Sequence, residues 1–445
     1  MNTHIEHTAL NENEEIMKTS EFDFMKKLPG LLRIIGTGAL LIAMYSFLIK
    51  GWDNGNDVFR YLLMLGHTGA LAAIGLASGH WLKESKGARL LLTLALVSVP
   101  ANFAILGAFI FSQAGSINLS QYPNYVAWTV DSMQTAMMTS GGALLILLPV
   151  TLLGFTVLAR SMSKRLTFLF LISNAALLLP IRDPMMVGLV VLALTVMTII
   201  FARKSSQQHI AAKTQEGIIA LGLQALPLAI LMGRTLWLYS ADMFLLTVMT
   251  ITIYFIFRQS ATFFEKGSRL KKMLDGLSLF PAIATAPLLV STLTETNWSI
   301  DALVLPLSTI VSAIMVYDIA QRHDNNAATY RWIAALMVVM GMSINMLFNA
   351  GVIAAITCIA AGVALLILGY KNKQRGFFIN GFILMLIGIA QQFYELVHHF
   401  NLGSWASMAV MGVITIVVAS IIEAKGNALH QRFSTWKTNF KQWEG

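Results

Sequence analysis

Long apolar stretches separated by short polar connections recur along the chain from Leu31 onward. Most are close to twenty residues long, and a helix rising about 1.5 Å per residue needs that length to cross about 30 Å of hydrocarbon. Residues 31–424 are therefore predicted to form the all-α domain of a polytopic membrane protein with about 14 transmembrane helices. The predicted spans are 31–49, 58–78, 90–112, 136–159, 166–180, 185–202, 218–236, 243–257, 274–293, 303–320, 332–349, 352–370, 377–400 and 405–424.

The distribution of Lys and Arg predicts how these spans cross the membrane. Very short connections leave a single kinked or re-entrant segment as the alternative at two places, 166–180 with 185–202 and 332–349 with 352–370. If every span crosses, all but four of the 31 Lys and Arg residues fall on the same side, as the positive-inside rule requires. This pattern favours fourteen crossings with both termini in the cytoplasm. The four cations left outside are Lys50, Arg60, Arg182 and Arg234.

The composition excludes a soluble chain. Hydrophobic residues make up 56% of the sequence, charged residues only 12%, and the mean hydropathy is +0.68, whereas soluble domains carry about 25% charged residues. The net charge of +9 has the same origin as the positive-inside pattern. It predicts contact with membrane lipids, mainly the anionic inner leaflet, and not with nucleic acid.

The two ends of the chain differ from the middle. Residues 1–30 are acidic, so they predict a disordered cytoplasmic tail and no cleaved signal peptide. Residues 425–445 are basic and place apolar side chains at helical spacing, which predicts an amphipathic helix on the cytoplasmic leaflet. This helix is either a membrane anchor or a docking site for a protein partner. Its apolar face comprises Leu429, Phe433, Trp436, Phe440 and Trp443.

Polar side chains at membrane depth are few, and each is costly unless it is paired or faces water. We expect most of them to form hydrogen bonds between helices. His67 is the one titratable group among them, with a structural role or proton transfer as its alternatives. The set comprises His67, Asn174, Gln224, Asn345, Asn349, Asn380, Gln391 and Gln392.

Two groups of charged or ligating residues lie near the predicted outer face. Glu395, His398 and His399 share one helical face, which makes them weak candidates for a metal site or a proton shuttle. Two hairpin turns place Arg182 beside Asp183 and Arg234 near Asp242. These pairs either neutralise each other or form a vestibule that attracts anions.

Signatures of enzyme chemistry are missing from the sequence. The cytoplasmic connections contain no Gly-rich phosphate loop with a Walker-type lysine, and HExxH and serine-protease patterns are absent. The single cysteine, Cys358, excludes an intramolecular disulfide and a thiolate cluster. We therefore expect no catalytic residues, no bound metal and no cofactor.

Several short stretches carry a family resemblance. The first precedes the penultimate span, the second lies near the end of that span, the third closes the last span and the fourth follows the second span: Gly369-Tyr370-Lys371-Asn372-Lys373-Gln374-Arg375-Gly376, Gln392-Phe393-Tyr394-Glu395-Leu396, Ile422-Glu423-Ala424-Lys425 and Gly79-His80-Trp81-Leu82-Lys83-Glu84. Together they resemble bacterial families of polytopic inner-membrane proteins known only as domains of unknown function. The resemblance implies a bacterial inner-membrane location and carries no site residue with it.

Three hypotheses about function follow. A transporter or flippase for a small or lipid-linked solute is favoured by the number of helices, by the outer cations and by prolines that could break helices around a cavity, namely Pro227, Pro281, Pro287 and Pro306. A scaffold or assembly subunit of a membrane complex is the alternative, and an intramembrane metal-dependent enzyme is the third hypothesis. The sequence does not identify the substrate, the coupling ion or the oligomeric state.

Overall fold

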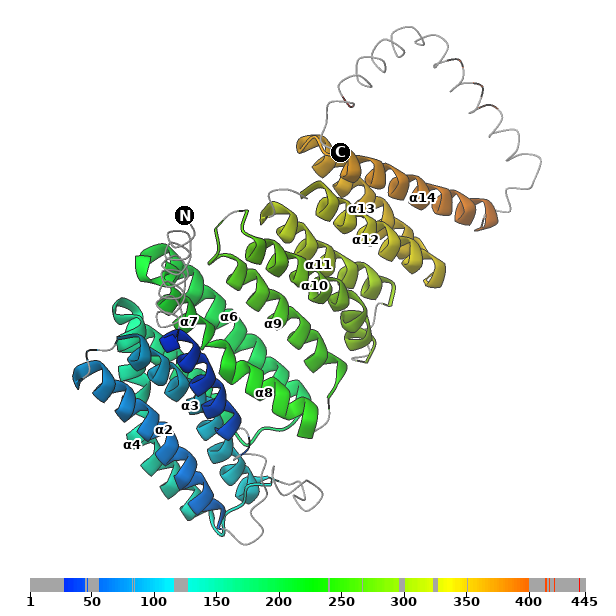
Figure 1. Ribbon diagram of the computed structural model, residues 1–445. Helices are drawn as coiled ribbons and strands as arrows, with labels where there is room; N and C mark the ends of the chain where they lie inside the picture. Colours follow the sequence, from blue (N-terminus) through cyan, green and yellow to red (C-terminus); the bar gives the residue numbers. More distant parts are fainter. Residues whose placement is uncertain are drawn as a thin grey trace, which may run out of the picture. The chain divides into compact units, whose positions relative to one another are not determined.

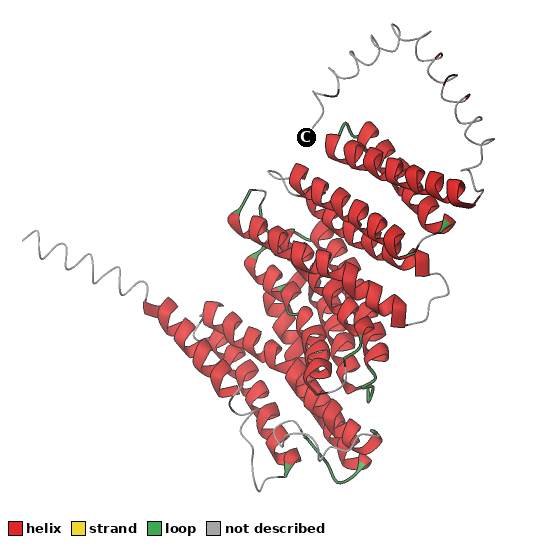
Figure 2. Ribbon diagram, turned by 90° about the vertical axis from the view of Figure 1, so that its right-hand side faces the viewer, coloured by secondary structure: helices red, strands yellow, loops and turns green. Residues whose placement is uncertain are grey.

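A computed structural model of the chain consists almost entirely of helices, and no strand forms among the residues it describes (Figure 2). Those residues are 28–44, 46, 56–81, 83, 85–115, 127–238, 241–265, 267–295, 301–322, 327–349 and 351–399, together with Val413, Ile416, Ser420 and Phe440.

Eleven helices within this part of the chain are long and apolar enough to cross a membrane, and the helix Leu28–Met44 is apolar but shorter. The all-α, multi-pass membrane class predicted from the sequence is therefore confirmed. The helices are α2 (Asp57–Trp81), α3 (Ser85–Ala114), α4 (Met133–Leu158), α5 (Ser163–Leu178), α6 (Pro184–Gln208), α7 (Gln215–Gly222), α8 (Ala225–Leu238), α9 (Met243–Ala261), α10 (Arg269–Glu295), α11 (Asp301–Arg322), α12 (Ala327–Phe348), α13 (Val352–Lys371) and α14 (Arg375–His399) (Figure 1).

The helices group into two compact units. Unit 1 comprises the chain up to Arg182 together with Ile200–Leu238, and unit 2 comprises Asp183–Ile199 and the chain from Tyr239 onward. The first part of α6 therefore belongs to unit 2 and its end to unit 1. The sequence predicted one transmembrane domain, and within it the packing of the helices defines these two units.

In unit 1, α3 packs against α2, α4, α5 and α8. It is apolar on all sides, as expected for a helix surrounded by others. The approach of α5 to α3 requires a glycine, because a Cβ atom on Gly107 would lie 2.0 Å from the carbonyl oxygen of Leu177. This contact fixes the end of α5 against α3.

One span of unit 1 is interrupted. Residues Gln215–Leu238 are long enough for a single crossing, but α7 ends at Gly222 and α8 starts at Ala225. Pro227 explains the break, since it has no N–H to donate and its ring clashes with the carbonyl group of Leu223. By contrast, Pro281, Pro287 and Pro306 lie within the continuous helices α10 and α11, so only Pro227 among these four prolines coincides with a break.

In unit 2, α9 to α12 pack in chain order, and α14 packs against both α12 and α13. Glycines bring the backbones of α13 and α14 together, because a Cβ atom on Gly362, Gly369 or Gly381 would lie 2.5 to 2.7 Å from a backbone nitrogen of the facing helix. Small residues at such contacts are typical of helix packing in membranes.

Candidate functional site

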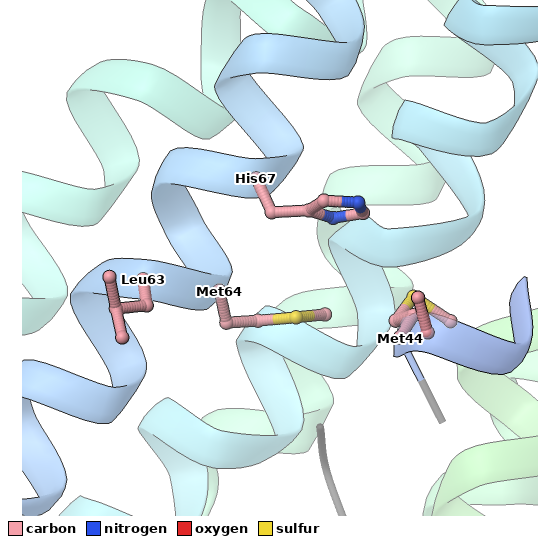
Figure 3. A pocket seen from close by; sticks show the side chains of 5 residues that line it. Met44, Leu63, Met64 and His67 are labelled. Atoms are coloured by element: carbon pink, nitrogen blue, oxygen red, sulfur yellow. The ribbon is translucent and has the colours of Figure 1, made fainter. Parts of the chain in front are cut away.

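A cavity of ≈ 200 Å³ lies in unit 1 between the helix Leu28–Met44 and α2. In Figure 3, His67 and Met64 extend from α2 towards Met44. The cavity walls are apolar except for the imidazole of His67. Its lining residues are Ala43, Met44, Leu63, Met64 and His67.

The face of α2 that lines the cavity also carries a buried cation. Arg60, Met64 and His67 are spaced by four and three residues, so they share one face of the helix. Seven residues of helix span about 10 Å, which places Arg60 about two turns from His67. We call Arg60, Met64 and His67 the α2 face.

A buried hydrogen-bond cluster links α2 to α3 next to this face. The Thr68 hydroxyl accepts from Ser98 Oγ and from Asn102 Nδ2, each at 2.9 Å, and donates to the Met64 carbonyl at 3.0 Å. Asn102 lies inside a predicted span, yet it was missing from the residues expected at membrane depth. The criterion that selected Asn174, an amide within an apolar stretch, would have found it.

Several buried polar atoms along α2 and α3 have no hydrogen-bond partner among the described residues. They are Nε and Nη2 of Arg60, the hydroxyl of Tyr61, Nδ1 of His67 and Oδ1 of Asn102. Each such group costs about 1–3 kcal/mol, and more when it is charged. Buried groups of this kind call for an explanation, and a bound ligand or water is a common one.

Arg60 is 3% exposed and lies at the start of α2. Its Nη1 donates to Asp57 Oδ1 at 3.0 Å, and its guanidinium carbon lies 4.2 Å from the centre of the Trp128 ring. Asp57 Oδ2 accepts from the backbone N–H of Thr129 at 2.9 Å. One carboxylate therefore holds both the arginine and the segment that carries Trp128.

Arg182 and Arg234, two of the predicted vestibule residues, meet at the C-terminal end of α5. Arg234 Nη1 donates to the Leu177 carbonyl at 2.9 Å, and Arg182 Nη1 donates to the carbonyl groups of Leu179 and Ile181 at 3.1 and 2.9 Å. Cations are favourable at a helix C-terminus, where carbonyl groups lack helical partners. Both arginines thus contribute to ending α5.

The two aspartates of the predicted vestibule cap helices of unit 2. Asp183 Oδ2 accepts from the Met186 N–H at 2.9 Å at the start of α6, and Asp242 Oδ1 accepts from the Leu245 N–H at 2.7 Å at the start of α9. N-terminal capping by Asp is a common structural role. The proposed attraction of anions by these turns stays a prediction.

The expected hydrogen bonds between helices occur for some amides only. Gln224 Nε2 donates to the Leu166 carbonyl of α5 at 3.3 Å, and Asn345 Nδ2 donates to the Ala302 carbonyl of α11 at 2.9 Å, which confirms the prediction for these two. Asn174 and Asn380 instead donate to carbonyl groups four residues earlier in their own helices. These two do not follow the expectation, since Asn side chains can also bond to the backbone of their own helix.

Unit 2 contains a charged network that the sequence analysis did not identify. Arg258 of α9 donates through Nε and Nη2 to both oxygens of Asp318 on α11, at 2.6 and 2.7 Å, and Tyr254 donates to the same carboxylate at 2.7 Å. Arg322 Nη2 lies 2.9 Å from Asp318, and its Nη1 lies 3.6 Å from Asp275 of α10. These contacts tie α9, α10 and α11 together.

Two predicted features fall outside the described part. The backbone of Glu395, His398 and His399 belongs to α14, but their side chains are not among those described. Among the described side chains, no three His, Cys, Asp or Glu residues form a group suited to binding a metal. Of the C-terminal anchor, Leu429, Phe433, Trp436 and Trp443 lie outside the described residues, and the Phe440 carbonyl accepts from Arg375 Nε at 2.8 Å.

Comparison with known proteins finds no matching family model, no similar curated protein and no similar solved structure. The α2 face and its cavity are therefore the features that bear on function.

Proposed function

We propose that the protein is a transporter or flippase that moves a small or lipid-linked solute. The observation that carries this proposal is the cavity beside His67. Engineered apolar cavities of about 150 Å³ bind benzene-sized molecules, so ≈ 200 Å³ suits a short stretch of hydrocarbon chain. One imidazole in an otherwise apolar wall supplies a polar contact, as in many ligand pockets.

The interrupted span supports the same proposal. Transporters often place their binding sites where a membrane helix is broken, and the break between α7 and α8 leaves Gln224 Oε1 buried with no hydrogen-bond partner in the described residues. We propose fourteen crossings in a bacterial inner membrane, with both termini cytoplasmic. The basic C-terminal segment then lies on the anionic leaflet or contacts a protein partner.

Native mass spectrometry of the gently extracted protein tests this function. Ala43→Phe fills the cavity, and Ala70→Phe adds the same side chain at an exposed position of α2. We expect a lipid or lipid-linked glycan to remain on the wild type and on Ala70→Phe but to be lost from Ala43→Phe. Equal retention by all three proteins would contradict the proposed site, and a co-purifying protein in place of lipid would favour the scaffold.

Lipid movement provides the functional measurement. Proteoliposomes that contain NBD-labelled phosphatidylglycerol report flipping through the fraction of label that dithionite can reduce. We expect the wild type and Ala70→Phe to expose the inner-leaflet label and Ala43→Phe to do so more slowly. A rate equal to that of protein-free vesicles, combined with lipid-free wild-type protein in the mass spectrometer, would overturn the flippase proposal.

A further inference from the structure

We propose that Arg60 binds the oxyanion of an amphiphilic substrate, a phosphate or a carboxylate, whose apolar part occupies the cavity at His67. This inference rests on the proposed function and names the substrate class for the same site. It starts from the guanidinium group of Arg60, which is buried and only partly hydrogen-bonded.

The Nε and Nη2 atoms of an arginine lie on the same edge of the guanidinium plane. Two parallel N–H groups on that edge match the two oxygens of a carboxylate or phosphate. In Arg60, the interaction with Asp57 uses Nη1 alone, and neither atom of the Nε–Nη2 edge has a hydrogen-bond partner among the described residues.

The same protein shows what this edge binds. Arg258 in unit 2 donates through Nε and Nη2 to the two oxygens of Asp318, at 2.6 and 2.7 Å. An external oxyanion would do for Arg60 what the Asp318 carboxylate does for Arg258. The stacking of Arg60 on Trp128, 4.2 Å from the ring centre, occupies a face of the guanidinium group and leaves its edge for hydrogen bonds.

Asp57 occupies only one nitrogen of the Arg60 guanidinium group. Its Oδ1 accepts from Arg60, while its Oδ2 accepts from Thr129. A charged donor pair with 3% exposure interacts more strongly with an anion than the same pair would in water. The burial of the open Nε–Nη2 edge therefore favours a substrate that brings an oxyanion to it.

The spacing along α2 defines the shape of the substrate. Arg60 and His67 lie on the α2 face about 10 Å apart, with Met64 between them and in contact with the cavity. A ligand that reaches both must carry its anionic group about two helical turns from its apolar part. This is the layout of an amphiphile with an oxyanion head and a hydrocarbon tail.

The first test uses the full-length protein in a maltoside detergent, which contains no phosphate. The protein is titrated with sodium phosphate in one arm and with dihexanoyl phosphatidylglycerol in the other, at constant ionic strength, while its melting temperature is recorded. We expect a saturable rise in at least one arm. A response to phosphate alone indicates a free anionic solute, and a response to the lipid alone indicates a lipid-linked one.

Two arginine variants locate the site. Arg60→Lys keeps the charge but replaces the two-point contact by a single one, so we expect the affinity to fall roughly tenfold or more. Arg258→Lys is the matched control, because Arg258 is also largely buried but already gives its Nε–Nη2 edge to Asp318 in unit 2. Its dissociation constant should stay at the wild-type value. An equal loss in both variants, or full binding by Arg60→Lys, would overturn the inference.

Trp128 gives a readout that does not depend on the folding of Arg60→Lys. Binding at the Arg60 edge should change the fluorescence of Trp128, and Trp128→Phe should remove that change. A signal that persists in Trp128→Phe would place the anion elsewhere and overturn the inference, as would the absence of any saturable response in the wild type. If lipid retention depended on Ala43 but not on Arg60, the proposed function would stand, but the inferred contact between Arg60 and an oxyanion would be wrong.

Discussion

Arg258 in unit 2 and Arg60 in unit 1 are both largely buried arginines, but their surroundings differ. Arg258 gives the Nε–Nη2 edge of its guanidinium group to Asp318, whose carboxylate also accepts from Tyr254. Arg60 uses one nitrogen for Asp57 and has two others without a hydrogen-bond partner in the described residues. A buried charge is tolerated when it is paired. The Arg258–Asp318 pair therefore stabilises helix packing, and the open edge of Arg60 is suited to binding.

Two tyrosines show the same difference. Tyr254 and Tyr61 are 1% and 0% exposed, so both hydroxyl groups are removed from solvent to the same extent. The Tyr254 hydroxyl interacts with Asp318 Oδ2 at 2.7 Å and with the Met315 carbonyl at 2.9 Å, whereas that of Tyr61 has no partner within the described part. The burial of the Tyr61 hydroxyl therefore has a cost that contacts among the described residues do not offset.

The largest expected effect comes from removing Arg258, and the matching change at Arg60 should have a much smaller one. Arg258→Met should destabilise the protein by about 3 kcal/mol, because it takes two charge-assisted hydrogen bonds from the buried carboxylate of Asp318. Arg60→Met should cost about 1 kcal/mol or less, since the lost interaction with Asp57 is offset by the removal of two unpaired donors. Thermal unfolding in detergent, followed by tryptophan fluorescence, measures both.

An exposed arginine provides the control for this pair. Arg165 donates to Gln208 in an exposed hydrogen bond, so Arg165→Met should leave the melting temperature almost unchanged. The proposed difference between the two arginines would be wrong if Arg60→Met and Arg258→Met lowered the melting temperature equally.

Replacing each tyrosine by phenylalanine should change the stability of the protein in opposite directions. Tyr254→Phe loses the interactions with Asp318 and Met315 and should destabilise the protein by about 1.5 kcal/mol, whereas Tyr61→Phe removes a buried hydroxyl without a partner and should stabilise it by about 1 kcal/mol. Both substitutions keep the aromatic ring, so packing changes little. Melting temperatures of the two variants under one set of conditions give the answer, and a loss of stability in Tyr61→Phe would show that its hydroxyl is satisfied.

The sequence predicted the helices well because membrane helices follow a local rule. A stretch of about twenty apolar residues has to form a helix in lipid to satisfy its backbone, and no information about neighbouring helices is needed. The break at Pro227 was open to the same local reasoning, although Pro281, Pro287 and Pro306 were selected by it too and lie within continuous helices. Whether a proline breaks a helix depends on its neighbours in space.

The charged network could not be predicted in this way. Asp275 and Asp318 lie near helix ends, where carboxylates normally contact water. The sequence identified Arg258 and Arg322 only as two of the cations on the predicted inner side. Their pairing depends on the packing of α9, α10 and α11. Arg60 was likewise identified as an outer cation, but its burial against Trp128 follows from the position of the segment that Asp57 holds.

The smallest expected effect belongs to the ion pair between Arg89 of α3 and Glu216 of α7, whose side chains are 42% and 32% exposed. Exposed pairs contribute about 0–1 kcal/mol and are screened by salt. Glu216→Gln should therefore lower stability by about 0.5 kcal/mol at low salt, and the difference should vanish at about 1 M salt. The Arg258→Met effect should persist there, because buried pairs are screened much less. Melting curves at the two salt concentrations separate the cases, and equal salt sensitivity would mean that burial does not distinguish these two ion pairs.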